Sequence, residues 1–169
     1  MPFTAAILTI SDLGARGQRE DTSGAAIKEM LSAAGIETSR YEIVPDEREQ
    51  ITARLREWAD SGAPDLIVTT GGTGLGPRDV TPEATRDALD YEVPGLAEAM
   101  RAEGLKHTKM SMISRAVAGV RGRTLIINLP GSPKSVRENL SVVLPVLEHA
   151  LSLLRGEASE HAAGPGPGT

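Results

Sequence analysis

A glycine-rich segment carries the clearest chemical signal in the sequence. It reads Thr70-Gly71-Gly72-Thr73-Gly74-Leu75-Gly76-Pro77-Arg78-Asp79-Val80 and follows the aliphatic run 65–69, which we expect to be a buried strand. Glycines let backbone N–H groups approach and surround an anion, and a helix that starts just after them adds its positive end. The alternative is a tight turn without a ligand, but the segment is longer than a turn needs. We therefore interpret it as an anion-binding loop at the carboxyl end of a strand.

This segment lacks the two commonest nucleotide signatures. No Gly-Lys-Ser or Gly-Lys-Thr closes it, which excludes the Walker A pattern, and Pro77 stands where the third glycine of G-x-G-x-x-G would be. The local pattern therefore predicts an anion without identifying it.

Polar residues also follow other expected strands, in the segments 9–12, 44–47 and 128–135. Because the carboxyl ends of parallel strands share one edge of a sheet, we expect these segments to meet the glycine-rich loop in one crevice. The carboxylates of Asp46 and Asp79 would then lie beside a phosphate-sized pocket. Two acids facing an anion require a divalent cation between them, and magnesium is the natural candidate. The alternative roles are a helix cap for Asp46 and a turn-forming side chain for Asp79.

Further polar groups are open to two readings. Lys134 follows Pro130-Gly131 at an expected helix start, where it could hold a second phosphate or be an ordinary exposed lysine. Ser111, Ser114 and Arg115 offer hydroxyls and a guanidinium, but they could equally lie on the surface. The three histidines are scattered, so their spacing predicts no metal site.

The surrounding pattern alternates short aliphatic runs with segments of helical period, which predicts an α/β protein with a mainly parallel sheet. We expect strands over 5–10, 36–44 and 65–69, and a hairpin over 116–120 and 124–129 that adds one antiparallel strand. Expected helices begin after caps at Thr22, Asp46 and Thr81, and others cover 94–104 and 132–154. Pro145 should kink or split the last helix. We predict one domain, 1–155, and a disordered tail, 156–169, rich in glycine and proline.

Composition excludes several classes of function. The 169 residues include no cysteine, so disulfide frameworks, thiolate metal sites and a cysteine nucleophile are ruled out. A net charge of −5 and 2% aromatic residues argue against nucleic acid as a partner. No export signal or membrane span is visible, so the expected location is the cytoplasm.

Several separated motifs together resemble those of the molybdopterin adenylyltransferases, the MogA/MoaB-type proteins of molybdenum cofactor biosynthesis, which are also similar to the G domain of gephyrin. The motifs are Thr70-Gly71-Gly72-Thr73-Gly74, Pro77-Arg78-Asp79-Val80-Thr81-Pro82-Glu83-Ala84-Thr85, Pro94-Gly95, Ser114-Arg115-Ala116 and Leu129-Pro130-Gly131-Ser132-Pro133-Lys134. The resemblance extends over about residues 4–155.

The resemblance implies a three-layer α/β/α fold, a homotrimer, and a reaction in which magnesium–ATP adenylylates the terminal phosphate of molybdopterin and releases pyrophosphate. By the same resemblance Asp46 and Asp79 are the essential acids, with Asp46 favoured as the magnesium ligand. The walls of the nucleotide pocket would be Gly71, Gly72, Thr73, Gly74, Leu129, Pro130 and Gly131, and the pterin would be held by Ser111, Ser114 and Lys134.

Two alternatives stay open. A molybdopterin-binding relative of the same fold could lack adenylyltransferase turnover, and a plain nucleotide- or phosphate-binding module would use the glycine-rich loop alone. Nothing in the sequence resembles a molybdate-inserting domain, so we expect that step to belong to a separate partner protein.

Overall fold

The computed structural model describes residues 2–157 and contains a six-stranded sheet in the order β2-β1-β3-β6-β5-β4. The expected tail lies almost entirely outside these residues. The strands are β1 (Thr4–Ile10), β2 (Glu37–Val44), β3 (Leu66–Thr70), β4 (Tyr91–Glu92), β5 (Ala118–Arg121) and β6 (Thr124–Leu129). β2, β1, β3 and β6 are mutually parallel. β5 pairs with β6 in the antiparallel sense, which confirms the predicted mostly parallel sheet with one reversed strand.

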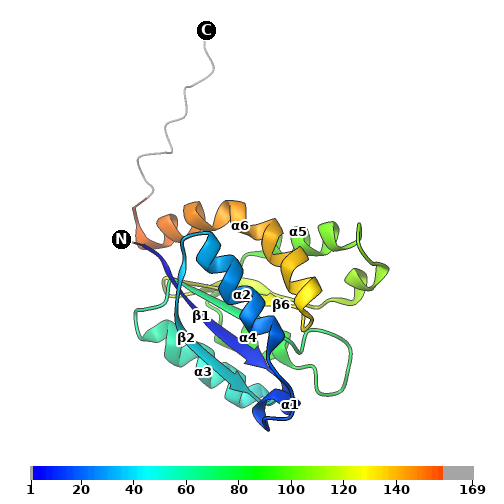
Figure 1. The fold of residues 1–169 in the computed structure, drawn as a ribbon. Coiled ribbons are helices and arrows are strands. Elements are labelled where there is room, and N and C mark those ends of the chain that lie inside the picture. Colours follow the sequence, from blue (N-terminus) through cyan, green and yellow to red (C-terminus); the bar gives the residue numbers. More distant parts are fainter. Residues whose placement is uncertain (1, 158–169) are drawn as a thin grey trace.

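Helices cover both faces of this sheet, giving three layers (Figure 1). Those with more than one turn are α2 (Thr22–Ala33), α3 (Arg48–Asp60), α4 (Thr81–Ala88), α5 (Pro94–Gly104) and α6 (Pro133–Arg155). α2, α5 and α6 pack on one face, and α3 and α4 pack on the other. No helix within residues 2–157 is long and apolar enough to cross a membrane.

The alternation of side chains along the central strands explains the two separate cores. In β1, Ala5 and Ile7 point into the core beneath α2 and α6, whereas Ala6, Leu8 and Ile10 point into the core beneath α3 and α4. All five side chains are buried, as expected for a parallel strand that is covered on both faces. The rigid part of the molecule is therefore built on β1, β3 and β6, whose carboxyl ends carry the polar loops.

Helix starts differ from the sequence expectations at three positions. The side chain of Asp21, not Thr22, caps α2 by accepting a hydrogen bond from the N–H of Gly24. The N-cap of α3 is Glu47 rather than Asp46, because the Asp46 carboxylate is engaged elsewhere. Val80 precedes α4, and the Thr81 hydroxyl donates instead to the carbonyl of Gly71.

Two further elements were not expected. A single-turn helix, α1 (Asp12–Ala15), lies in what the sequence suggested was a loop, and a two-residue strand, β4, extends the sheet beyond β5. α6 is not split at Pro145 but continues through it as one helix of 23 residues, and Figure 1 shows its two halves at an angle to each other. A short 3-10 helix, η1 (Lys109–Ile113), follows α5.

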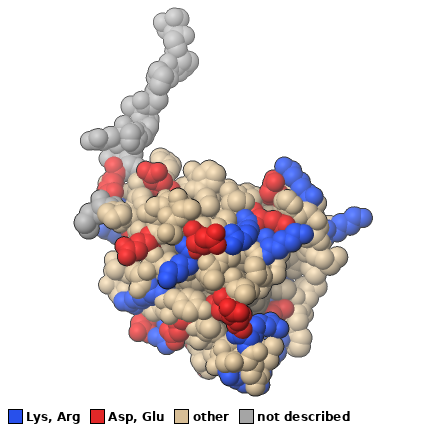
Figure 2. Space-filling model, viewed as in Figure 1, with Lys and Arg blue, Asp and Glu red and all other residues tan. Residues whose placement is uncertain are grey.

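Acidic and basic side chains are intermixed on the face drawn in Figure 2, without a continuous basic surface over the helices.

Candidate functional site

A cavity of about 250 Å³ lies at the carboxyl ends of β1 and β3. The sequence reasoning placed Asp46, Asp79 and the glycine-rich segment in one crevice, and the structure brings them together here. The cavity is lined by Thr9, Ile10, Ser11, Gly14, Arg19, Glu20, Asp21, Thr22, Ser23, Asp46, Thr70, Gly71, Gly72, Asp79 and Gly131. We call it the first cavity.

The glycine-rich segment needs glycine at positions 71 and 72. Gly71 and Gly72 have φ angles of 101° and 69°, which side chains other than glycine rarely adopt. A Cβ on Gly71 would also overlap the carbonyl oxygen of Ile10. The segment is fastened to the neighbouring loop because the N–H of Gly71 donates to the carbonyl of Leu129 at 3.1 Å. These two glycines therefore carry the backbone across the floor of the first cavity.

Asp46 is held by a reciprocal pair of hydrogen bonds with Asp12. The N–H of Asp12 donates to Asp46 Oδ2 at 2.9 Å, and the N–H of Asp46 donates to Asp12 Oδ1 at 3.0 Å. Burial raises the pKa of Asp46 above its ordinary value, and the carboxylates of Asp12 and Asp79 add to the rise. The first cavity thus gathers negative charge that a cation would relieve.

The Arg78 side chain, which is not part of the lining of the first cavity, links Asp12 to Glu47, the residue after Asp46. Arg78 donates to both carboxylate oxygens of Asp12 at 3.1 Å and to Glu47 Oε1 at 2.9 Å. The hydrogen bond from Arg78 lowers the pKa of Asp12, which therefore stays ionised beside Asp46. Arg78, the neighbour of Asp79 in sequence, is therefore bonded to Asp12, and Asp12 in turn holds Asp46.

The Asp79 carboxylate closes its own loop. Asp79 Oδ2 accepts a hydrogen bond from the N–H of Gly76 at 2.9 Å, and a Cβ added to Gly74 or Gly76 would stand 3.0 Å from that oxygen. The other carboxylate oxygen, Oδ1, accepts no hydrogen bond from any residue within 2–157. The loop therefore leaves one oxygen of Asp79 available to a ligand in the first cavity.

A second cavity of about 240 Å³ lies on the other side of the glycine-rich segment. It contains Ser111 and Ser114, and the full lining is Thr73, Gly74, Gly104, Thr108, Met110, Ser111, Ile113, Ser114, Pro130, Ser135, Glu138 and Asn139. The wall between the two cavities comes from two loops, since residues 71–72 and 131 face the first cavity and residues 73–74 and 130 face the second.

Comparison with known proteins places this arrangement in a family. Residues 6–149 match the family described as a probable molybdopterin binding domain. The chain belongs to this molybdopterin-binding family. It is 45% identical over 152 residues to a molybdopterin adenylyltransferase of Helicobacter pylori, with 89% of this chain and 86% of that protein covered.

Solved structures of the family superpose closely on this molybdopterin-binding fold. The molybdopterin biosynthesis enzyme MoaB from Thermus thermophilus has a TM-score of 0.86 and 62% identity, with 91% of this chain and 97% of that chain covered. A MogA structure has a TM-score of 0.84 and 43% identity, with 89% and 99% covered. The Drosophila melanogaster molybdenum cofactor synthesis protein cinnamon is 41% identical, and the match spans 93% of this chain but 26% of that longer protein.

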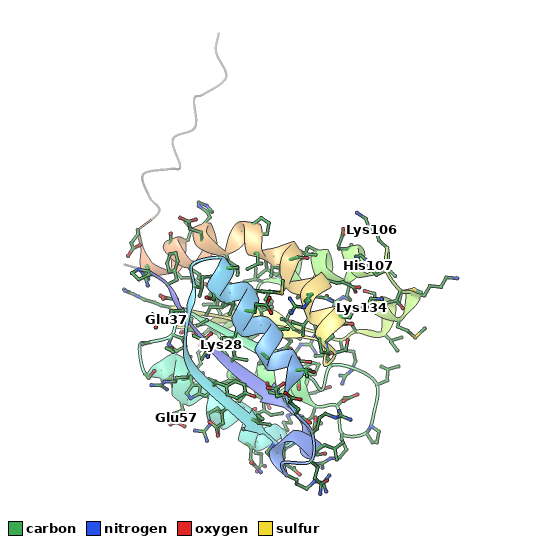
Figure 3. All side chains as sticks on the ribbon, in the orientation of Figure 1. Lys28, Glu37, Glu57, Lys106, His107 and Lys134 are labelled. Carbon is green, nitrogen blue, oxygen red and sulfur yellow. The ribbon has the colours of Figure 1, made fainter. Side chains whose placement is uncertain are left out.

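Within this family member, two expected ligand-binding residues lie apart from both cavities. The side chain of Leu129 is fully buried in the core, and only its carbonyl reaches the glycine-rich segment. Lys134 is exposed in the first turn of α6, where Figure 3 labels it, and it lines neither cavity.

Sequence reasoning also missed residues that the fold brings to the first cavity. Arg19 is the one basic side chain among the described residues of its lining. Asp21 accepts hydrogen bonds from the Thr9 hydroxyl at 2.6 Å and from the Tyr41 hydroxyl, and Ser23 donates to the carbonyl of Gly131 at 2.9 Å. A signal was present, because residues 19–23 span the start of α2, the long helix that follows β1, but their types match no simple motif.

No group of three or more histidine, aspartate or glutamate side chains within residues 2–157 forms a preassembled metal cage. Two carboxylates with available oxygens suit magnesium, which keeps several water ligands and binds through one or two carboxylates together with substrate phosphates. The residues present therefore fit a magnesium ion that arrives with a nucleotide.

Proposed function

We propose that this chain is a molybdopterin adenylyltransferase of molybdenum cofactor biosynthesis. In the proposed reaction, magnesium–ATP adenylylates the terminal phosphate of molybdopterin and pyrophosphate is released. The relatives that cover most of the chain carry this name or belong to the same biosynthesis. The alternative is that the chain binds molybdopterin, like other members of the fold, but does not catalyse adenylyl transfer.

One observation carries the proposal: the glycine-rich segment is the common wall of two cavities of similar volume. We assign the triphosphate of ATP to the first cavity, with Asp46, Asp79 and the amide of Gly72. We assign the pterin to the second, with Ser111 and Ser114. Two substrates bound on either side of this segment would be held next to each other, and holding both reactants in position is what transfer between them requires.

The chemistry asks for charge neutralisation rather than a strong base. A phosphate oxygen of molybdopterin forms a bond to the α-phosphorus of ATP, and the bond from that phosphorus to the bridging oxygen of the β-phosphate breaks, so pyrophosphate leaves with the electron pair. A phosphate monoester has its second pKa near 6, so the nucleophile is already a dianion at neutral pH. The barrier is therefore the approach of two anions.

The residues of the first cavity supply positive and directional groups for that approach. Arg19 provides a cation, and the backbone amide of Gly72 provides a hydrogen-bond donor that needs no reorganisation. Asp46 and Asp79 would hold the magnesium ion, which when bound neutralises phosphate charge. The Lys134 side chain is exposed at the start of α6 and lines neither cavity, so we assign it no role at the reacting phosphates.

The direct test is incubation of the purified chain with molybdopterin, ATP and magnesium, followed by mass detection of adenylylated molybdopterin. We expect the product and pyrophosphate in equal amounts. Asp79→Asn is the matched variant, and it should keep the fold while losing most turnover. Saturable binding of molybdopterin without any product would favour the relative that lacks turnover, and binding of ATP alone would favour a plain nucleotide module.

Three associated expectations stay predictions of the family resemblance: a homotrimer, a separate molybdate-inserting partner and a cytoplasmic location. Sedimentation equilibrium tests the first, with a mass three times 17.8 kDa as the expected result.

A further inference from the structure

We propose that Arg115 is a positioning residue, whose guanidinium fastens the neck of the Asp79 loop and so holds the Asp79 carboxylate at the first cavity. The proposal rests on the proposed function in one respect, that the Asp79 carboxylate serves a metal–nucleotide complex. The sequence left Arg115 open as either a binding group or a surface residue.

The guanidinium spans the two ends of the loop. Arg115 Nε donates to the carbonyl of Gly74 at 2.8 Å, and Arg115 Nη2 donates to the carbonyl of Asp79 at 2.7 Å. The backbone N–H of Arg115 also donates to the carbonyl of Thr73 at 2.9 Å. One residue, distant in sequence from the loop, therefore closes its neck with three hydrogen bonds.

The loop between these carbonyls has one other side-chain anchor, Arg78, which binds Asp12 and Glu47 at the far side of the loop from its neck. Residues 75–78 are all exposed, and the Leu75 side chain is 67% exposed. Inside the loop, the N–H of Asp79 donates to the carbonyl of Gly76 at 3.0 Å, and the Asp79 carboxylate accepts from the N–H of Gly76. These bonds tie the carboxylate to the loop, so the orientation of the loop decides where the carboxylate points.

A glutamate on the next helix orients the guanidinium. Arg115 Nη1 pairs with Glu83 Oε1, and Glu83 lies in the first turn of α4, which starts directly after the loop. Each of these two side chains is 33% exposed, so the pair is shielded from water on most of its surface. Glu83, Arg115 and the two carbonyls thus form one connected set from α4 to the neck of the loop.

Only arginine fits this position. The planar guanidinium carries five N–H donors in a rigid fork, and here it uses three different nitrogens for three acceptors. A lysine has one nitrogen at the end of a flexible stem, so it cannot reach both carbonyls and the Glu83 carboxylate with the same geometry. Arg115→Lys therefore keeps the positive charge but loses the simultaneous hydrogen bonds to the carbonyls of Gly74 and Asp79 and to the Glu83 carboxylate.

Arg121 provides a matched control at the other end of the sheet. It donates to both oxygens of Asp60 at 2.9 and 3.0 Å and to the carbonyl of Ala88 at 2.9 Å, so it also joins a carboxylate to a main-chain carbonyl. Its side chain is 23% exposed, and it lines neither the first nor the second cavity. Arg121→Lys makes the same chemical change away from the site.

The test compares Arg115→Lys, Arg121→Lys and the unaltered chain by two measurements that need no turnover. Hydrogen–deuterium exchange reports on the amides of Gly76 and Asp79, and electron paramagnetic resonance measures Mn²⁺ binding in the presence of a non-cleavable ATP analogue. We expect exchange about 10-fold faster and Mn²⁺ binding about 10-fold weaker in Arg115→Lys, because groups that orient a metal ligand typically contribute a factor of about 10–100 to metal affinity. Arg121→Lys should change neither.

A double-variant cycle separates positioning from a purely structural role. If Arg115 acts through Asp79, then Arg115→Lys added to Asp79→Asn should weaken Mn²⁺ binding no further than Asp79→Asn alone. Independent, additive effects would overturn the proposal. Should Arg115→Lys lower the melting temperature by more than about 5 °C, Glu83→Gln, which releases one nitrogen of the guanidinium, takes its place with the same direction expected.

The outcomes distinguish this proposal from the proposed function. If the unaltered chain makes adenylylated molybdopterin while Arg115→Lys behaves like Arg121→Lys, the positioning role is overturned and the function stands. If the unaltered chain makes no product but Arg115→Lys speeds loop exchange and weakens Mn²⁺ binding, the function fails and the positioning role stands.

Discussion

Replacing Asp46 with asparagine should move stability and activity in opposite directions. The folded structure raises the pKa of Asp46 from 3.8, so at neutral pH the ionised carboxylate is held where its charged form is disfavoured. Asparagine has nearly the same shape and can still accept the hydrogen bond from the N–H of Asp12. The substitution therefore removes unfavourable charge and keeps the local contact.

The magnitude follows from the neighbours of Asp46. Arg78 neutralises much of the charge of Asp12, so burial of the Asp46 carboxylate and repulsion from Asp79 are what mainly disfavour its charged form, by an amount on the order of 1 kcal/mol at a partly hydrated site. For a chain of this size, that corresponds to a melting temperature about 3 °C higher at pH 7. Loss of a metal ligand should at the same time reduce adenylylation by about 100-fold or more.

The pH dependence of the melting temperature shows whether the Asp46 charge stabilises or destabilises the fold. A carboxyl group with a raised pKa in the folded state stabilises the fold only while it is protonated, and that contribution is lost as the pH rises through the raised value. The melting temperatures of Asp46→Asn and the unaltered chain should therefore converge below about pH 4 and separate as the pH rises toward 7.

Differential scanning calorimetry from pH 3.5 to 7.5 measures this difference, with Asp87→Asn as the control. Asp87 is paired with Arg48 on the surface, and the hydrogen bond from Arg48 lowers the pKa of Asp87, so its loss should slightly reduce the melting temperature at pH 7 and leave activity intact. An Asp46→Asn variant that melts lower than the unaltered chain at pH 7, or that retains near-normal adenylylation, would refute the reasoning.

Three other substitutions test the fold and the site. Asn128→Ala removes three buried hydrogen bonds beneath the glycine-rich segment, so the free energy of unfolding should fall by about 3 kcal/mol. The melting temperature should then be roughly 8 °C lower, and a loss of less than about 1 kcal/mol would contradict this expectation. Burial alone would raise the pKa of Asp65, but hydrogen bonds from Arg155 and a backbone N–H lower it, so Asp65→Asn should cost about 2 kcal/mol at pH 7 in urea unfolding. The difference from the unaltered chain should begin to shrink only below about pH 4 and should disappear as the pH falls through the lowered pKa of Asp65. Gly72→Ala forces a φ of 69° on alanine and places its Cβ against the Thr81 hydroxyl, so we expect about 1–2 kcal/mol of lost stability and weaker binding of an ATP analogue by calorimetry; unchanged binding would show that the backbone at Gly72 does not contact the nucleotide.

The residue pattern alone predicts the layer architecture. The mostly aliphatic runs at β1, β3 and β6 are typical of strands in a sheet that is covered on both faces, and the short segment around Gly122 can only reverse the chain. The pattern also predicts that the glycine-rich segment and Asp46 meet, because loops at the carboxyl ends of parallel strands share one edge. The two-residue β4 carries no such pattern, since strand pairing alone gives it its structure.

Which polar side chain pairs with which partner follows from the packed fold and not from the local residue pattern. Asp46 satisfies the local rules for a helix cap, yet it pairs with Asp12, because the end of β2 lies beside the start of α1 and a reciprocal pair of hydrogen bonds is available there. Arg115 and the loop that it fastens are about forty residues apart, and the Lys134 side chain is exposed to solvent. Such choices depend on distances across the sheet edge, and those distances are set by packing of the core and are not written in any local pattern of residues.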